Sequence, residues 1–119
     1  NKTGKQVFQG LAGLFIINDA EEAALNLPSG SNELPLVIQD KRITNSSIPY
    51  DPSVEEIMAG YMGESIVVNG VYAPYTEVAT RYYRLRILNG SNARVYNLAM
   101  SNNADMMIIG NDGGLLSNP

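Results

Sequence analysis

The sequence predicts an all-β fold, a β-sandwich or barrel with one or two short helical turns. Two stretches within residues 81–100 alternate apolar and polar side chains with a period of two, and Asn-Gly-Ser-Asn at positions 89–92 separates them. Upstream, Asn69-Gly70 lies between two β-branched runs, which is the pattern of a type I′ hairpin turn. Helix-start signals precede only two short segments. Many short strands joined by turns are typical of sandwiches and barrels.

The N-terminal part of the chain predicts a loop, a strand and a short helix. Residues 1–6 are polar and predict a loop, and residues 7–18 predict a strand whose small residues let another backbone come close. Asp19 and Glu22 have capping-box spacing, which predicts one or two helical turns before Pro28 ends the helix. Residues 28–32 read PSGSN, a composition that favours turns over packing. A boundary is expected there.

The rest of the chain predicts strands and a second short helix. Pro35 lies at the start of a predicted strand, where its missing N–H costs least. Ser53 and Glu56 again have capping-box spacing and predict a helix that Gly60 ends. The remaining predicted elements are a strand at 34–43, a hairpin of 65–68 with 71–73, an antiparallel strand pair of 83–88 with 95–100, a strand at 105–109 and a turn at 110–114.

Composition excludes several classes of function. With 119 residues, 45% hydrophobic and 17% charged, the chain is sized for one domain or parts of two and is expected to fold. The net charge of −4, without a basic run, argues against a nucleic-acid surface, and no apolar run reaches the ~20 residues of a membrane helix. The sequence contains no His and no Cys. Thiol catalysis, Ser-His-Asp catalysis, zinc fingers and blue-copper ligation are therefore impossible within this chain.

Several residues could carry chemistry, and each has a simpler structural interpretation. Asp112 lies between turn residues and lacks a phosphate-binding spacing, so we interpret it as a turn residue. Asn45 and Asn89 begin glycan-acceptor sequons, which are frequent by chance, and turn roles are favoured for both. The acidic pairs Glu21-Glu22 and Glu55-Glu56 fit the first turns of helices.

Five methionines and three arginines could also carry chemistry, and each set has a simpler structural interpretation. The methionines could offer thioether sulfur to soft copper, but their spacing favours core filling; they are Met58, Met62, Met100, Met106 and Met107. Arg84, Arg86 and Arg94 could form a binding patch, although a solvated sheet face that pairs with nearby carboxylates is favoured. No catalytic, cofactor-binding or metal-binding residue is predicted in this chain.

Five blocks in order resemble the three-domain multicopper oxidases. They are residues 2–14 (KTGKQVFQGLAGL), 36–41 (LVIQDK), 68–70 (VNG), 84–94 (RLRILNGSNAR) and 112–116 (DGGLL). Within that family the chain is most similar to the copper-efflux oxidases, spore-coat laccases and bilirubin oxidases of bacteria. The resemblance covers essentially the whole chain and implies a partial cupredoxin-like Greek-key β-sandwich or barrel.

The resemblance also implies a division of the chain and a function for its parent protein. Residues 1–27 would be the last strand region of the first cupredoxin domain with the start of the linker, residues 28–33 the linker, and residues 34–119 the first part of the second domain. The chain would begin just past a His-x-His copper motif. The parent would oxidise phenols, pigments or Cu(I) at a blue-copper centre and reduce dioxygen to water at a three-copper cluster. The second domain would hold the copper domains in place without copper ligands, so the segment alone is expected to be inactive.

The partial sheet implied by the resemblance predicts partners for this chain. Two other functions of the chain are also considered. A partial sheet leaves an apolar face and unpaired edges, so we expect the remaining cupredoxin domains or a second copy of the chain to cover them. The chain is then expected to be a fragment or a homo-oligomer, with a periplasmic, extracytoplasmic or spore-coat location. One alternative is a stand-alone β-sandwich module for protein interaction or carbohydrate binding. The other is a relative that has lost its copper and has a structural role.

Overall fold

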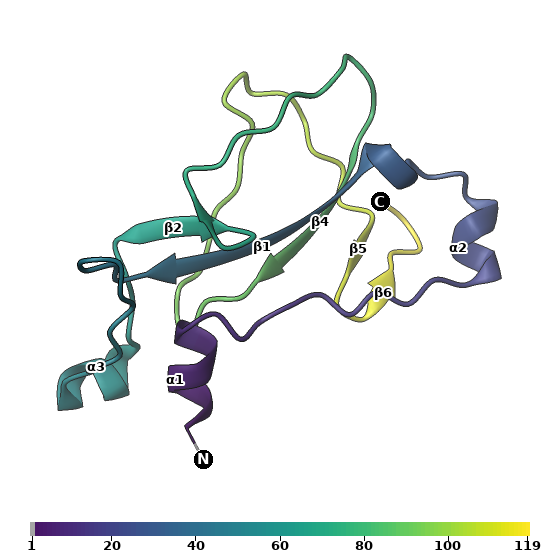
Figure 1. Cartoon of the computed structure of the whole chain (residues 1–119). Helices are drawn as coiled ribbons and strands as arrows, with labels where there is room; N and C mark the ends of the chain where they lie inside the picture. Colours follow the sequence, from purple (N-terminus) through teal and green to yellow (C-terminus); the bar gives the residue numbers. More distant parts are fainter. Residues whose placement is uncertain (1) are drawn as a thin grey trace.

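The computed structural model describes residues 2–119, and its main element is an open four-stranded sheet with short helices at its ends (Figure 1). The sheet has the strand order β3-β2-β1-β4, and a separate two-stranded ribbon pairs β5 with β6. The strands are β1 (Glu33–Lys41), β2 (Ser65–Val68), β3 (Val71–Tyr72), β4 (Arg84–Asn89), β5 (Gly110–Asn111) and β6 (Gly114–Leu115). The helices are α1 (Thr3–Phe8), α2 (Ala20–Ala24), the 3-10 turn η1 (Gly30–Asn32) and α3 (Val54–Ala59). The mostly β character confirms the predicted fold class, and the sheets remain open.

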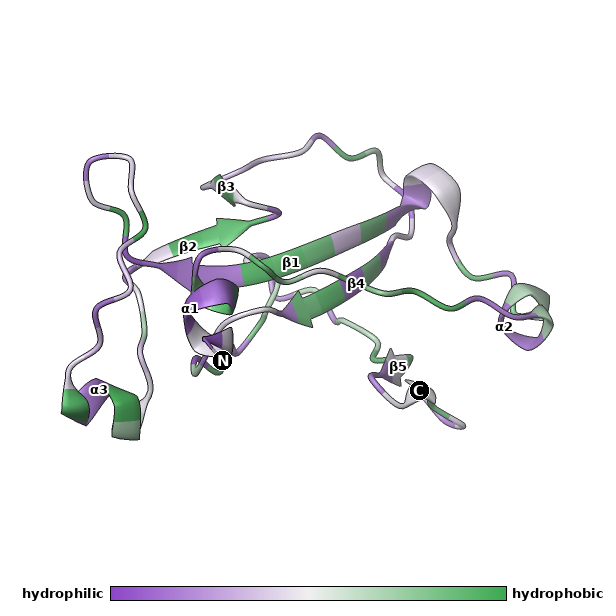
Figure 2. Cartoon of the chain, turned by 60° about the horizontal axis from the view of Figure 1, so that its bottom comes forward, coloured by the Kyte–Doolittle hydropathy of each residue, from purple (hydrophilic) through white to green (hydrophobic). Residues whose placement is uncertain are grey.

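β1 is the centre of the sheet. It pairs antiparallel with β2 over Ile38–Lys41 and parallel with β4 over Glu33–Ile38. Its middle is apolar, whereas its C-terminal end carries Gln39, Asp40 and Lys41 (Figure 2). All three of these polar residues are buried. The end of β1 therefore combines polar chemistry with burial, and the site described below is built around it.

Three local predictions agree with the structure. Asp19 caps α2 by accepting the backbone N–H of Glu22, and α2 ends well before Pro28. Ser53 and Glu56 form a complete capping box for α3. Asn69 and Gly70 both have positive φ, 51° and 78°, as a type I′ turn requires. Each of these devices depends on residues at most three positions apart, which is why the sequence alone reveals it.

Two predictions for the N-terminal part are wrong: the loop at residues 1–6, of which residues 3–6 are helical, and the strand at residues 7–18. Thr3–Phe8 forms helix α1, and residues 9–18 run extended without joining a sheet. Gly10, with φ of 115°, ends α1 because its N–H donates to Val7 and the next N–H, of Leu11, donates to Gln6. The side chain of Phe8 is buried against Tyr50 and Tyr61, with ring centroids 5.7 and 4.7 Å away. Packing against distant aromatic rings therefore fixes this helix.

The predicted strand pair is only half formed. Residues 83–88 correspond to β4, but residues 95–100 form no strand, and β4 pairs parallel with β1 rather than folding back on itself. The chain leaving β4 is held by β1, because Gly90 N–H donates to Ile38 O and Ser91 Oγ accepts the N–H of Asp40. The strand predicted at 105–109 is also absent. Residues 110–115 form the β5–β6 ribbon instead, with its turn at Asp112-Gly113.

The apolar core is small. The buried hydrophobic side chains among residues 2–119 are Phe8, Ile38, Tyr61 and Val67. Large rings such as those of Phe15, Tyr75 and Tyr82 are at least 90% exposed. The core-filling prediction for the methionines is wrong within this chain, since all five are between 39% and 85% exposed. Within residues 2–119 one open four-stranded sheet and a short ribbon leave these side chains partly or largely exposed.

Asn69 does more than form the hairpin turn. Its backbone N–H donates to Val37 O, its side-chain Oδ1 accepts the N–H of Val37 at 2.8 Å, and its Nδ2 donates to Pro35 O at 3.0 Å. The carboxamide thus acts like one more peptide group of β2. It extends the pairing of β2 along β1, beyond the last backbone pair of the two strands, Ile38 with Val68.

We expect Asn69→Asp to destabilise the intact protein by roughly 1–3 kcal/mol, because a carboxylate cannot donate to Pro35 O and leaves two oxygens facing each other. The exposed Asn97 gives the matched control, Asn97→Asp, which adds the same charge. Thermal unfolding midpoints of the two variants measure the difference. Equal midpoints would show that the carboxamide bonds contribute nothing.

Candidate functional site

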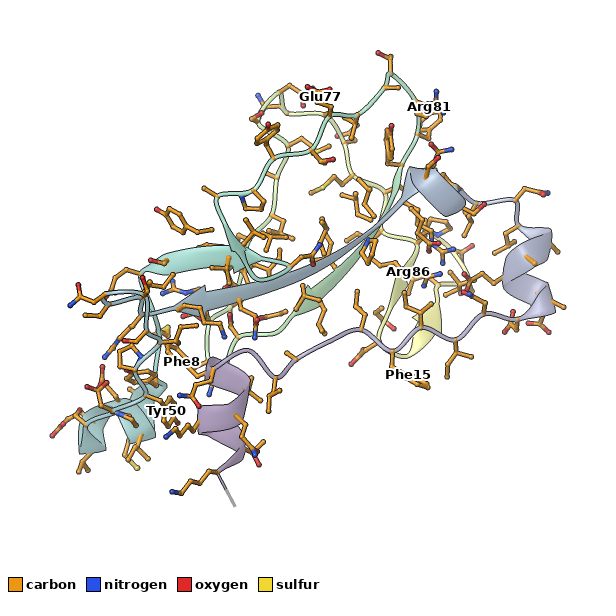
Figure 3. All side chains as sticks on the ribbon, in the orientation of Figure 1. Phe8, Phe15, Tyr50, Glu77, Arg81 and Arg86 are labelled. Atoms are coloured by element: carbon orange, nitrogen blue, oxygen red, sulfur yellow. The ribbon has the colours of Figure 1, made fainter. Side chains whose placement is uncertain are left out.

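The first cluster of charged residues joins the segment around α2 to the sheet. Arg84 and Arg86 of β4 pair with Glu22 of α2 and Glu33 at the start of β1. Figure 3 labels Arg86 in this cluster. Glu22 Oε1 lies 2.7 Å from Arg84 Nη1 and 2.7 Å from Arg86 Nη2. Glu33 Oε1 pairs with Arg86 Nε, and the same oxygen lies 3.8 Å from Arg84 Nη1. These two arginines do pair with nearby carboxylates, as predicted, but the predicted solvated face is wrong for Arg84, which is buried.

The electrostatics of this first cluster favour the ionised form of the Glu22 carboxyl. Hydrogen bonds from Arg84 and then Arg86 hold the pKa of the Glu22 carboxyl below its ordinary value, although partial burial opposes this. The Arg84 side chain is 8% exposed and that of Glu22 16% exposed. Glu22 also keeps the role expected of an acidic residue in the first turn of a helix. Its partners lie more than sixty positions away, so no local signal in the sequence identifies them.

The second cluster surrounds Asp40 and lies apart from the first, so the three arginines do not form one patch. Asp40 Oδ2 accepts the N–H of Gly63 at 2.7 Å and Nε of Arg94 at 3.1 Å, and the side chain is fully buried. Arg94 Nη2 also donates to Gly63 O at 2.7 Å. The other carboxylate oxygen, Oδ1, has no hydrogen-bond partner among the described residues. Asp40 therefore ties β1, the loop before β2 and the chain after β4 together.

Gly63 is the position where these segments come closest. A side-chain Cβ at Gly63 would lie 2.1 Å from the carbonyl carbon of Lys41 and 2.3 Å from its oxygen. Lys41 itself is buried, and its Nζ donates to the carbonyl oxygens of Val7 and Phe8. Burial lowers the pKa of Lys41. The same end of β1 thus also holds α1, through the partly desolvated ammonium group of Lys41.

The balance of forces on Asp40 predicts how stability depends on pH. Burial raises its pKa, but the Gly63 N–H, the Ser91 hydroxyl and Arg94 together hold the pKa below the ordinary value. A lowered pKa in the folded state gives stability that is present above the ordinary Asp pKa of about 3.9 and is lost as the pH falls through the folded-state pKa.

We therefore expect wild-type protein to unfold at a higher temperature than Asp40→Asn at neutral pH, with the gap closing below about pH 4. The amide variant resembles the protonated acid, so both proteins have similar side chains once Asp40 is protonated. Unfolding midpoints of the intact proteins between pH 3 and pH 7 measure the gap, and a gap that stays constant with pH would contradict the assignment.

The remaining candidate residues have structural roles. Asp112 lies in the β5–β6 turn, as predicted. Asn45 and Ser46 have positive φ in a tight turn bridged by Thr44 and Ser47. The side chain of Asn89 forms hydrogen bonds within its own loop. Its Oδ1 accepts the N–H of Ser91, and its Nδ2 donates to Arg94 O.

Copper, which the resemblance implies for the parent protein, does not fit any set of residues in this chain. Blue-copper and related centres are held by imidazole and thiolate groups, and the sequence has no His and no Cys. Residues 2–119 also contain no group of three acidic side chains that could hold a metal ion. Among the same residues, no helix has the length and apolar character needed to cross a membrane.

No protein-family model matches the chain. The cell division protein FtsP of Xenorhabdus nematophila is 42% identical over 122 residues, which cover 100% of this chain and 25% of FtsP. The laccase of Bacillus subtilis is 42% identical over 124 residues, which cover 96% of this chain and 24% of the laccase. The chain thus spans about a quarter of the length of these relatives.

A solved structure gives the same result at the level of the fold. The 2F4 variant of the McoA multicopper oxidase from Aquifex aeolicus is 45% identical, with a TM-score of 0.82, and the match covers 97% of this chain and 26% of that one. The class is therefore that of cupredoxin-fold proteins. Over nearly its whole length the chain is similar to one segment of multicopper oxidases, the laccase among them.

Proposed function

We propose that this chain is a copper-free structural segment of a laccase-like multicopper oxidase. The parent protein couples oxidation of phenols, pigments or Cu(I) to reduction of dioxygen to water. The observation that carries the proposal is the 42% identity to a laccase over 96% of the chain, in a sequence that has no copper ligands of its own. All copper would be bound by residues outside the segment, and the copper would supply the electron-transfer chemistry.

Within that protein the segment would connect and position the copper domains. Residues 1–27 would belong to the end of the first cupredoxin domain, residues 28–33 to the linker and residues 34–119 to the second domain. The interaction of Phe8 with Tyr50 and Tyr61, and of Lys41 with the end of α1, supports such a role, because these contacts join the two sides of the linker. The exposed apolar side chains would be covered by the other domains of the same polypeptide.

The test uses the intact protein, purified and supplied with copper. We expect stoichiometric copper, the visible absorption of a copper–thiolate bond, and oxygen uptake with a phenolic substrate. The matched control is the same preparation after copper is removed with a chelator, which should lose both the absorption and the oxygen uptake. An intact protein that folds but binds no copper would overturn the proposal.

A second candidate function rests on a specific observation. FtsP, described as a cell division protein, is as similar to this chain as the laccase is, at 42% identity. The parent could thus be a relative that has lost its copper and acts as a structural protein in cell division. The copper measurement separates the two candidates, since this one predicts a folded protein without copper and without oxygen uptake. The family resemblance favours a location outside the cytoplasm, in the periplasm or the spore coat.

A further inference from the structure

Residues 23–32, which include most of the proposed linker, are flanked by two glutamates that bind the same pair of arginines. Glu22 lies in α2, before the proposed linker of residues 28–33, and Glu33 is the last linker residue and the first residue of β1. Both carboxylates contact Arg84 and Arg86 of β4. The parallel register places Glu33 directly opposite Arg84. The four side chains, which we call the linker clamp, carry two positive and two negative charges. The clamp therefore closes residues 23–32 into a loop on the sheet without leaving an unbalanced charge.

Apolar packing does not hold α2 in place. None of its residues is buried, and Leu25, which follows it, is 57% exposed. A cavity of about 430 Å³ lies between α2 and the sheet, and charged residues such as Asp19, Glu22 and Arg84 line it. Beyond the clamp, Arg86 Nη2 also reaches Asn18 Oδ1, at 3.3 Å. Within this segment, charge pairing is thus the main interaction that fixes α2 against β4.

The side chains of the linker clamp are partly buried, which strengthens the attraction between their charges. Its side chains are between 8% and 24% exposed, so water screens them less than it screens a surface pair. Arg84 and Arg86 are on the same strand at alternate positions, and both reach the single oxygen Oε1 of Glu22. A shared acceptor with two guanidinium partners fixes an orientation, because moving α2 would break both contacts together.

We propose that Arg84 and Arg86 are positioning residues that set the orientation of α2 and the linker relative to the sheet. The proposal rests on the domain division proposed above, in which residues 1–27 belong to the preceding domain. Breaking the clamp should release α2 and the linker locally while the sheet stays intact.

The test is amide hydrogen exchange in the intact protein with Glu22→Gln. We expect the amides of residues 20–32 to exchange about ten-fold faster or more, and those of β1 at residues 34–41 to keep their wild-type rates. The matched control is Glu21→Gln, which removes the neighbouring charge from the same helical turn, where the side chain is exposed. The control should leave all rates unchanged. This readout does not involve copper, so its failure is distinct from failure of the proposed oxidase function.

A salt series on wild-type protein gives an independent measurement that needs no variant. Raising the salt from about 0.05 M to about 0.5 M should speed exchange in residues 20–32 of wild-type protein, and it should have little effect there in Glu22→Gln. Three results would each overturn the proposal: unchanged linker exchange in Glu22→Gln, equal acceleration in Glu21→Gln, or acceleration that extends through β1.

Discussion

Replacing Gly63 with alanine is expected to destabilise the intact protein by about 4 kcal/mol or more, enough to reduce its soluble yield sharply. The added Cβ would lie 2.1 Å from the backbone carbon of Lys41, a distance at which one of the two backbones must move. Movement would also break the bonds that Gly63 makes to Asp40 and Arg94. The clash involves the backbone of the central strand, so no side-chain rotation relieves it.

Gly13→Ala is the matched control for this variant, because nothing lies within 4 Å of a Cβ built at that exposed glycine. Its effect should stay within about 0.5 kcal/mol. Soluble yield and the thermal unfolding midpoint of the intact protein measure both variants. A Gly63→Ala protein with the yield and midpoint of the control would show that the loop before β2 does not approach β1 as described.

The second large effect is expected for Asp40→Ala, at about 3 kcal/mol. The substitution removes the acceptor of the Gly63 N–H and the counter-charge of Arg94, and it leaves space where a fully buried side chain was. Asp40 Oδ1 has no hydrogen-bond partner among residues 2–119, which reduces the expected loss because the native carboxylate is not fully hydrogen-bonded there.

Asp105→Ala provides the comparison for Asp40→Ala, since Asp105 is an exposed carboxylate on an irregular segment. Chemical denaturation of the intact proteins, followed by a probe of β-structure, should show a clear shift of the midpoint for Asp40→Ala and almost none for Asp105→Ala. Coincident midpoints would mean that the Asp40 cluster does not hold the three segments together.

The sequence alone predicted the parts of the fold that depend on neighbouring residues. Asn69-Gly70, the Ser53 capping box and the Asp19 cap each need only a few adjacent side chains, and all three are present in the structure. The family resemblance extended the prediction further, because ordered blocks along the whole chain identify a fold that local patterns leave ambiguous.

The errors arose where distant residues decide the structure. Residues 7–18 contain an apolar run that suits a strand, but the contact of Phe8 with Tyr50 and Tyr61 favours a helix. Residues 95–100 alternate as a strand does, yet they do not pair with β4, whose partner in the sheet is the distant strand β1. The clamp and the Asp40 cluster were missed for the same reason. Their arginines were identified, whereas their partners come from other elements.

The parallel pairing of β1 with β4 also determines the order in which this segment can form during synthesis. The bond from Gln39 to Gly90 joins residues 51 positions apart, whereas the β2–β3 hairpin closes over a two-residue turn. Pairings between distant residues form slowly, because a long loop must close first. One edge of β1 therefore stays open until residues 84–90 have left the ribosome. During that interval the nascent chain exposes an apolar strand edge, which is the feature that chaperones and aggregation compete for.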